Sequence, residues 1–293
     1  MTDSLGTILT AMVTPFDADG AVAHERLSAL ADHLLANGSD GLVVAGTTGE
    51  SPTLSDDEKL AMFRSVAGVA RGRGTVVAGT GSNDTRHSVE LTKAAEGCGV
   101  DAVLAVVPYY NKPPERGILA HFRAVAAATS LPVIVYNIPG RCVVNLSPEA
   151  LAELARVENI VAVKQANPDL AETDRLMELS DLGVYAGNDD MLCDVAVRGG
   201  LGGICVASHL VGPRMAEVVR LCRDGDTDAA RAADAVLHGL YKALFVTANP
   251  IPVKAALNLL GHDVGGLRLP LVPADPDEEA VVAAELRRLG LLA

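Results

Sequence analysis

Lys164 is the residue around which this chain could organise a reaction. It follows residues 158–163, a run of β-branched and small apolar side chains that is typical of a strand buried on both faces. An amino group at the end of such a strand faces a pocket, where a poorly solvated ammonium loses its proton readily. The neutral amine is a nucleophile that condenses with a carbonyl to give a Schiff base. Most lysines in this position are solvated strand ends, so the interpretation depends on the residues that gather around it.

The side chains that could assist such an imine follow three other predicted strands: Thr47 and Thr48, Tyr109 and Tyr110, and Tyr136 and Arg141. Tyr136 and a threonine hydroxyl can relay the protons that imine formation requires. Backbone amides of the turn at 47–50 can hold a carboxylate beside the ketone, and Arg141 can bind a second carboxylate bidentately. Taken singly, these groups fit a turn, a capping aromatic and a solvated charge. Their joint placement favours a keto-acid site that needs no metal and no organic cofactor.

These groups can meet only if their strands end at one edge. Eight predicted strands alternate with helices, at 7–13, 41–46, 75–78, 102–107, 132–136, 158–163, 183–186 and 203–206. Consecutive parallel strand–helix units with right-handed crossovers close into a TIM barrel, whose active site lies at the C-terminal ends of the strands. A doubly wound sheet is the competing architecture, but no GxGxxG follows the first strand. We therefore predict an α/β fold, a (β/α)8 barrel over residues 1–223, with a C-terminal helical bundle over residues 224–293 packed on it.

Composition excludes several classes of function. Of the 293 residues 49% are hydrophobic and only 3% are aromatic, which predicts a large aliphatic core. The net charge of −13 argues against nucleic acid and against anionic membrane surfaces as partners. Apolar runs are too short to span a bilayer and residues 1–4 lack a signal-peptide pattern, so we expect a cytoplasmic protein. Five cysteines without CxxC and histidines without ligand spacing predict neither a disulfide framework nor a metal site, and Asp189-Asp190 is expected to be a helix cap.

Five motifs resemble those of the dihydrodipicolinate synthase and N-acetylneuraminate lyase superfamily: GTTGES at 46–51, PYYNKP at 108–113, YNIPGR at 136–141, VK at 163–164 and NPIPVK at 249–254. The match runs from about residue 7 to residue 270 in the same order and spacing. PYYNKP, NPIPVK and the arginine of YNIPGR point to the dihydrodipicolinate synthase branch. The resemblance implies a lyase that condenses pyruvate with aspartate semialdehyde to 4-hydroxy-tetrahydrodipicolinate, in lysine and diaminopimelate biosynthesis, without a cofactor.

The resemblance also implies a role for each site residue. Lys164 would form the Schiff base with pyruvate. Tyr136, Thr48 and Tyr110 would form the proton relay, with Tyr110 reaching in from a neighbouring subunit. The implied substrate-binding residues are Thr47 and Thr48 for the pyruvate carboxylate, Arg141 for the carboxylate of the semialdehyde, and Ile204 and Gly187 in the pocket. Members of the family are usually homotetramers built as dimers of dimers, so a homo-oligomer is expected.

The chain departs from the family pattern at three places near the expected second-substrate site. Cys142-Val143 replace Thr-Gly, Gln165 replaces Glu, and Gly187-Asn188 replaces a glycine–acid pair. These departures keep open another pyruvate-dependent aldolase, or a 2-keto-3-deoxy sugar acid lyase or dehydratase of the same superfamily. Arg141 discriminates between them, because a polyhydroxylated acceptor would favour neutral hydrogen-bonding groups there. A barrel that only binds a keto acid is disfavoured by the full set of Lys164, Tyr136, Thr48 and Tyr110.

Inhibition by lysine is expected to be weak or absent. Lysine-regulated relatives bind the amino acid at a subunit interface through a histidine pair, a downstream Asn and a Glu. At the matching positions this chain has Asp56, Lys59, Asn83 and His87, and Tyr109 is retained. Lys59 places a cation where the ammonium of the ligand would need desolvating, and His87 replaces the carboxylate that would pair with it.

Overall fold

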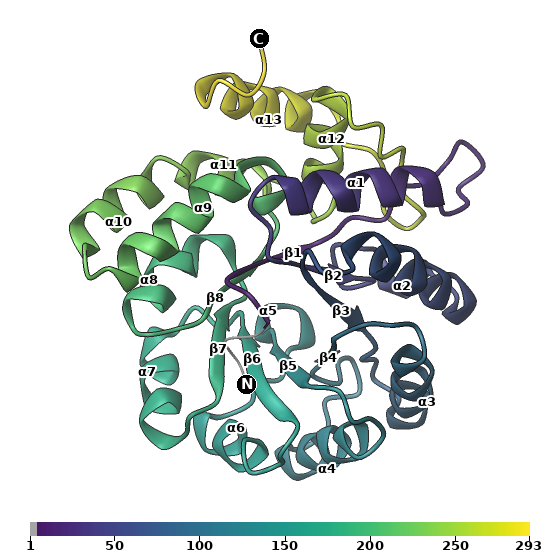
Figure 1. Ribbon diagram of the computed structural model, residues 1–293, viewed down its shortest axis with the longest axis vertical. Coiled ribbons are helices and arrows are strands. Elements are labelled where there is room, and N and C mark those ends of the chain that lie inside the picture. Colours follow the sequence, from purple (N-terminus) through teal and green to yellow (C-terminus); the bar gives the residue numbers. More distant parts are fainter. Residues whose placement is uncertain (1–4) are drawn as a thin grey trace.

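The computed structural model describes residues 5–293, and its centre is a closed barrel of eight parallel strands (Figure 1). The strands are β1 (Ile8–Ala11), β2 (Gly41–Val44), β3 (Thr75–Gly79), β4 (Ala102–Val106), β5 (Val133–Asn137), β6 (Ile160–Gln165), β7 (Gly183–Ala186) and β8 (Gly202–Cys205). They follow one another in chain order, and β1 pairs with β8 to close the barrel. The predicted (β/α)8 fold is confirmed. Residues 1–4, in which no signal-peptide pattern was found, lie outside the described residues.

Successive side chains of each strand point to opposite faces of the barrel wall, and they therefore form two separate hydrophobic cores. One set of side chains fills the barrel and comes from all eight strands: Leu9, Val43, Val77, Leu104, Ile134, Ala162, Tyr185 and Ile204. The opposite set packs against the surrounding helices. Because successive side chains of a strand point to opposite faces, Lys164 shares the inward face of β6 with Ala162.

The outside of the barrel is covered by α1 (His24–Ala36), α2 (Asp56–Ala70), α3 (Thr85–Glu96), α4 (Glu115–Ala126), α6 (Pro148–Leu154), α7 (Leu170–Leu179), α8 (Leu192–Val197) and α9 (Ser208–Arg223). Shorter turns are η2 (Ser51–Thr53), α5 (Pro139–Cys142) and η3 (Asp189–Met191). The sequence of residues 55–58, with Ser55 three residues before Glu58, predicts a capped helix start, and the structure confirms it for α2. Ser55 Oγ accepts a hydrogen bond from Glu58 N at 3.2 Å, and Glu58 Oε2 accepts one from Ser55 N at 2.8 Å.

Four further helices follow the barrel: α10 (Thr227–Ala235), α11 (His238–Ala243), α12 (Ile251–Leu259) and α13 (Pro276–Arg288). Figure 1 shows them outside the ring of helices, on the side of α1 and α9. Helix α10 packs on α9, and α12 packs against both α9 and α13. None of the helices within residues 5–293 is long and apolar enough to cross a membrane.

The sequence pattern predicts a helix from residue 213 to residue 222, whereas α9 begins at Ser208, because a helical turn precedes a kink at Val211 (φ −133°, ψ 29°). The segment after β5 contains the single helical turn α5 with Pro139 at its first position. That turn carries Arg141.

Candidate active site

Lys164 lies in the barrel interior beside Tyr136. The two residues are direct partners in the pairing of β5 with β6, and Lys164 Nζ lies 4.3 Å from the centroid of the Tyr136 ring. Only 5% of Lys164 is exposed, and within residues 5–293 its Nζ makes no hydrogen bond. An amino group held next to a phenol at a strand end is the arrangement that imine formation with proton transfer requires.

The turn after β2 brings Thr47 and Thr48 to the same end of the barrel. It bends sharply, with positive φ angles at Ala45 (54°) and at Glu50 (58°). Strand β3 makes room for the turn through Gly79, where a Cβ would lie only 2.4 Å from Ala45 O. The glycine therefore allows the backbone of the turn to approach the neighbouring strand.

Residues from the C-terminal part of the chain hold this turn in place. Thr48 Oγ1 accepts a hydrogen bond from Asn249 Nδ2 at 2.9 Å. Glu50 Oε1 accepts one from Lys254 Nζ at 2.9 Å, and the same ammonium donates to Thr14 O at 2.8 Å. All of these side chains are buried. Burial lowers the pKa of Lys254, and the Glu50 carboxylate opposes that shift.

Residues 249–254 were recognised only as a family motif, and their contacts with the turn were not predicted. A signal was present, because Lys254 interrupts an apolar run in α12. A lysine surrounded by apolar residues in a helix is rarely buried without a partner. The identity of that partner, 204 positions earlier, could not be read from the run itself.

A cavity of about 670 Å³ opens beside these residues, within the range of small-molecule sites. Predicted site residues that line it are Thr47, Tyr136 and Arg141, together with Tyr109. Tyr109 is partly buried, and burial raises its pKa. The structure thus places Thr47, two tyrosines and a guanidinium around one cavity at the C-terminal end of the barrel. Lys164 is not among the described residues that line the cavity, and it is connected to the cavity through the adjacent Tyr136.

Two of the departures from the family pattern lie next to Arg141. Cys142 is buried, lines the cavity and donates its thiol to Val107 O at 3.3 Å. Burial raises the pKa of Cys142 to about 11, so the thiol is neutral near pH 7. Val143 is 67% exposed and has a φ of 65°. Neither residue adds a charge beside Arg141.

Gln165 was expected near the second-substrate site, and this expectation is wrong. Because it follows Lys164 in β6, its side chain points away from the barrel interior. It is buried in a polar network, in which Gln165 Oε1 accepts hydrogen bonds from Asn137 Nδ2 at 2.9 Å and from Asn167 N at 3.3 Å. Asn137 Nδ2 also donates to Asn145 Oδ1 at 2.8 Å. The replacement at 165 therefore concerns strand packing rather than the cavity.

Three residues after β7 and in β8 complete this end of the barrel. Ile204 is fully buried in its interior. A Cβ at Gly187 would lie 2.8 Å from the Cβ of Ala166, so a larger residue does not fit there. Asp189 was expected to cap a helix, but within residues 5–293 it makes no cap hydrogen bond to η3 or α9. Its carboxylate instead accepts hydrogen bonds from the amides of residues 206 and 207, which connect β8 to α9, both at 2.8 Å. Burial raises the pKa of Asp189, while the two amides and the Lys164 charge oppose the shift.

Tyr110 is not brought to the cavity of its own chain. Its side chain is 88% exposed, and its backbone has a φ of 68°. The neighbouring Tyr109 lines the cavity instead. An exposed aromatic side chain at this position is what a tyrosine reaching into another subunit requires, and that role stays a prediction.

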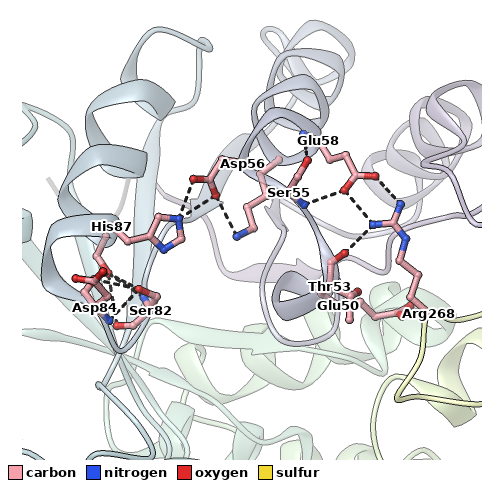
Figure 2. A network of polar contacts seen from close by, with 11 residues as sticks. Glu50, Thr53, Ser55, Asp56, Glu58, Ser82, Asp84, His87 and Arg268 are labelled. Carbon is pink, nitrogen blue, oxygen red and sulfur yellow. Dashed lines mark hydrogen bonds and ion pairs between the residues drawn. The ribbon is translucent and has the colours of Figure 1, made fainter.

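At its far end the cavity reaches a cluster formed by Asp56, Lys59 and His87. His87 Nε2 lies 2.8 Å from Asp56 Oδ2, and Lys59 Nζ lies 3.6 Å from Asp56 Oδ1. Figure 2 shows the His87 ring and the Asp56 carboxylate pointing toward each other from α3 and α2. Lys59 is buried although it is charged, so Asp56 is the group that offsets its charge.

Within residues 5–293 no three His, Cys, Asp or Glu side chains are arranged to hold a metal ion.

The chain is similar to known proteins over nearly its whole length. The family model described as the dihydrodipicolinate synthetase family matches residues 4–289. A 4-hydroxy-tetrahydrodipicolinate synthase from Bacillus velezensis is 47% identical over 288 residues, which is 98% of this chain and 100% of that protein.

Solved structures agree with this similarity. The dihydrodipicolinate synthase of Cyanidioschyzon merolae, determined with lysine bound, superposes with a TM-score of 0.96 at 43% identity and covers 98% of this chain and 99% of its own. The chloride-inhibited enzyme of Acinetobacter baumannii, complexed with pyruvate, gives a TM-score of 0.95 at 37% identity and covers 99% and 100%. The likeness therefore extends over both the barrel and the helices that follow it.

Proposed function

Because this chain belongs to the dihydrodipicolinate synthetase family, we propose that it condenses pyruvate with aspartate 4-semialdehyde to 4-hydroxy-tetrahydrodipicolinate. It is an enzyme of the lyase class, and curated relatives at this level of identity over full length carry the name of that synthase. The observation that carries the proposal at the site is the pair formed by Lys164 and Tyr136 at the end of the barrel. This reaction belongs to lysine and diaminopimelate biosynthesis.

The proposed reaction begins with attack of Lys164 Nζ on the ketone carbon of pyruvate. The resulting carbinolamine loses water to give an iminium ion, and Tyr136 and Thr48 move the protons that these steps require. Loss of a proton from the methyl group gives an enamine, which attacks the aldehyde carbon of the second substrate. Backbone amides and hydroxyls at Thr47 and Thr48 hold the pyruvate carboxylate, and Arg141 holds the carboxylate of the semialdehyde.

An assay of acceptor aldehydes tests this proposal. The enzyme is supplied with pyruvate and, in parallel, with aspartate semialdehyde and a panel of sugar-derived aldehydes. We expect turnover with the semialdehyde to exceed turnover with every neutral polyhydroxylated aldehyde, because Arg141 lines the cavity and provides a cation for a carboxylate. A higher kcat/KM for a sugar-derived aldehyde would contradict the proposed acceptor.

Arg141→Ala is expected to lower kcat/KM for aspartate semialdehyde while pyruvate still forms its imine. Loss of a charge-assisted contact of about 1.5–3 kcal/mol corresponds to a roughly 10- to 150-fold decrease. Arg141→Lys keeps the charge but not the bidentate geometry, so its loss should be intermediate. Arg116→Ala, which removes the same charge from an exposed position on α4, is the matched control. Unchanged kinetics in Arg141→Ala would exclude the contact.

We further propose that the enzyme is a homo-oligomer, a tetramer built as a dimer of dimers, in which Tyr110 enters the site of a neighbour. Its 88% exposure in the single chain supports this arrangement.

Tyr110→Phe should lower turnover without unfolding the protein, since only a hydroxyl is removed. When the Tyr110→Phe variant is mixed with the inactive Lys164→Ala variant, activity should recover. The reason is that some sites in the mixed oligomers then combine an intact Tyr110 from one subunit with an intact Lys164 from another. No recovery after proven subunit exchange would show that the tyrosine is not shared.

Lysine is expected to inhibit this enzyme weakly or not at all. In the structure Asp56 already contacts Lys59 and His87, so the ammonium group of an incoming lysine would meet the Lys59 cation. A titration of the steady-state rate at saturating pyruvate measures this, and half-inhibition by submillimolar lysine would refute it. The matched variant carries Asp56→His, Lys59→His and His87→Glu, which restores the residues of regulated relatives, and it should gain inhibition.

A further inference from the structure

We propose that Cys193 and Cys222 form a dithiol site that a low-molecular-weight disulfide oxidises to a protein disulfide, which then joins α8 to α9. The Sγ atoms of the two cysteines lie 4.0 Å apart, although the residues are 29 positions apart in the chain. Both thiols are free in this structure. Cys193 lies in the first turn of α8 and Cys222 in the last turn of α9, and the two helices pack against each other beside α10 (Figure 1).

The other three cysteines of the chain have no such partner. Within residues 5–293 no sulfur of another cysteine lies within hydrogen-bonding distance of Cys98, Cys142 or Cys205. The thiols of Cys98 and Cys142 donate instead to backbone carbonyl groups, and Cys205 lies beside a buried carboxyl group. A cysteine of this kind is a small apolar side chain that fills the core. Cys193 and Cys222 are therefore the two thiols of the described chain that can react with each other.

The distance between the two sulfur atoms can be closed by side-chain rotation. Bonded sulfur atoms lie about 2.0 Å apart, so each Sγ must move by about 1 Å, which a rotation about each Cα–Cβ bond provides. Cys222 Sγ also lies 3.9 Å from the carbonyl oxygen of Cys193, so its side chain already approaches the backbone of α8. We therefore expect oxidation to leave the two helices in place.

The packing around the pair determines which thiol meets an oxidant first. Cys193 belongs with Val218 and Ala230 to a small cluster between α8, α9 and α10 that is separate from the two cores of the barrel, and Cys222 packs at the edge of this cluster. Cys193 is 3% exposed, whereas Cys222 is partly exposed. A reagent in solution thus reaches Cys222, and Cys193 is the thiol behind it.

Burial and nearby charges make the first step slow. Burial raises the pKa of Cys193 to about 12 and also raises the pKa of Cys222. The charge of Asp234 raises both pKa values further, and the Arg231 guanidinium opposes these shifts. Both thiols are therefore protonated near pH 7, so their attack on an external disulfide is slow. The second step is fast by comparison, because the two sulfur atoms are already in contact. A mixed disulfide should consequently not accumulate.

The proposed oxidation is a thiol–disulfide exchange in two steps. Cys222 loses its proton, and its thiolate attacks one sulfur of the external disulfide, so that a bond to Cys222 Sγ forms, the S–S bond of the reagent breaks and one thiolate leaves. Cys193 then loses its proton and attacks Cys222 Sγ, which displaces the second thiolate. The protein dithiol gives up two electrons, and the reagent is reduced to two thiols, which take up the two protons.

The disulfide would close a ring of residues 193–222, which contains β8. This strand pairs with both β7 and β1 and so closes the barrel. A cross-link restricts the unfolded chain more than the folded one, so the melting temperature of the oxidised protein should rise by roughly 5–10 °C. Lys164, Tyr136 and Arg141 lie outside the ring, so kcat should stay within about 2-fold of that of the reduced enzyme.

Incubation of the full-length enzyme with oxidised glutathione tests the proposal. Peptide mapping without reduction should show one disulfide, between the peptides that carry Cys193 and Cys222, and the protein should lose the mass of two hydrogen atoms. Dithiothreitol should reverse both changes. In Cys193→Ala glutathione should instead stay attached to Cys222, because no second thiol displaces it. Cys222→Ala, which changes a partly exposed residue at a helix end, should form neither the disulfide nor this adduct.

Cys98→Ala is the matched control, because it removes a buried thiol that has no sulfur partner within residues 5–293. This variant should still form the disulfide and should show the same rise in melting temperature on oxidation. The proposal is overturned if Cys193 and Cys222 both remain free after incubation at about pH 8.5, near the pKa of an ordinary thiol. A bond between other cysteines, or an equal rise in melting temperature in Cys222→Ala, overturns it as well.

Discussion

Replacing Lys164 by alanine is expected to lower kcat by at least about 10⁴-fold, the largest effect of any substitution in this chain. The reason is that, among residues 5–293, Lys164 Nζ is the amino group that lies beside Tyr136 at the end of the barrel, where the imine is proposed to form. Lys164→Arg should lose as much, because a guanidinium stays protonated and is not a nucleophile. Folding should be preserved in both, since the side chain makes no hydrogen bond within residues 5–293.

Borohydride trapping measures whether pyruvate forms an imine on Lys164. Wild-type enzyme reduced in the presence of pyruvate should gain the mass of one adduct, on the peptide that carries Lys164. Lys59→Ala is the matched control, because Lys59 is a buried lysine that lines the cavity but lies in the cluster with Asp56. This variant should keep the adduct. An adduct on Lys59, or one that persists in Lys164→Ala, would disprove the proposed chemistry.

Lys254→Met is expected to lower the free energy of unfolding by about 3–5 kcal/mol, because it leaves a buried carboxylate without its cation. Lys254 and Glu50 are 1% exposed each, and the ammonium also donates to Thr14 O and Gly266 O. The substitution therefore removes an ion pair and leaves backbone acceptors without a donor. Activity should fall with stability, because Glu50 belongs to the turn that carries Thr47 and Thr48. Urea unfolding followed by circular dichroism measures the change.

Two variants control this experiment. Lys242→Met removes an exposed lysine at the end of α11 and should change stability by no more than about 0.5 kcal/mol. Adding Glu50→Gln to Lys254→Met removes the unpaired charge, so the double variant should be less destabilised than the sum of the two single changes. Additive losses would mean that the ion pair contributes nothing to the fold.

The sequence predicted the part of the site that follows from periodicity. Alternating strands and helices fix where strand ends lie, so the sequence alone assigns Lys164, Tyr136 and Thr47 to one end of a barrel. The strand containing Lys164 also determines that Gln165 points outward. The outward direction of Gln165 is therefore already contained in the sequence, because it follows from the alternation of side chains along β6.

Other contacts could not be predicted from the sequence. The bonds from Asn249 to Thr48 and from Lys254 to Glu50 join positions 201 and 204 apart, and no periodic pattern specifies such pairs. Nor does any local signal specify that the segment after β5 forms a helical turn, because Pro139 is equally suited to a loop. These features depend on how the helices after the barrel dock, which is a property of the complete tertiary structure.

The attachment of residues 249–268 to the turn after β2 has a consequence for biosynthesis. A ribosome releases the eight strands of the barrel well before it has made Asn249, Lys254 and Arg268. Until then Glu50 lacks the Lys254 ammonium and the Arg268 backbone amide, which neutralise and hold it, and Thr48 lacks its donor. A nascent or C-terminally truncated chain can therefore form barrel strands but not an ordered catalytic turn. Catalytic competence is therefore expected only after residue 268 has been made, so products that stop before it should not carry a working site.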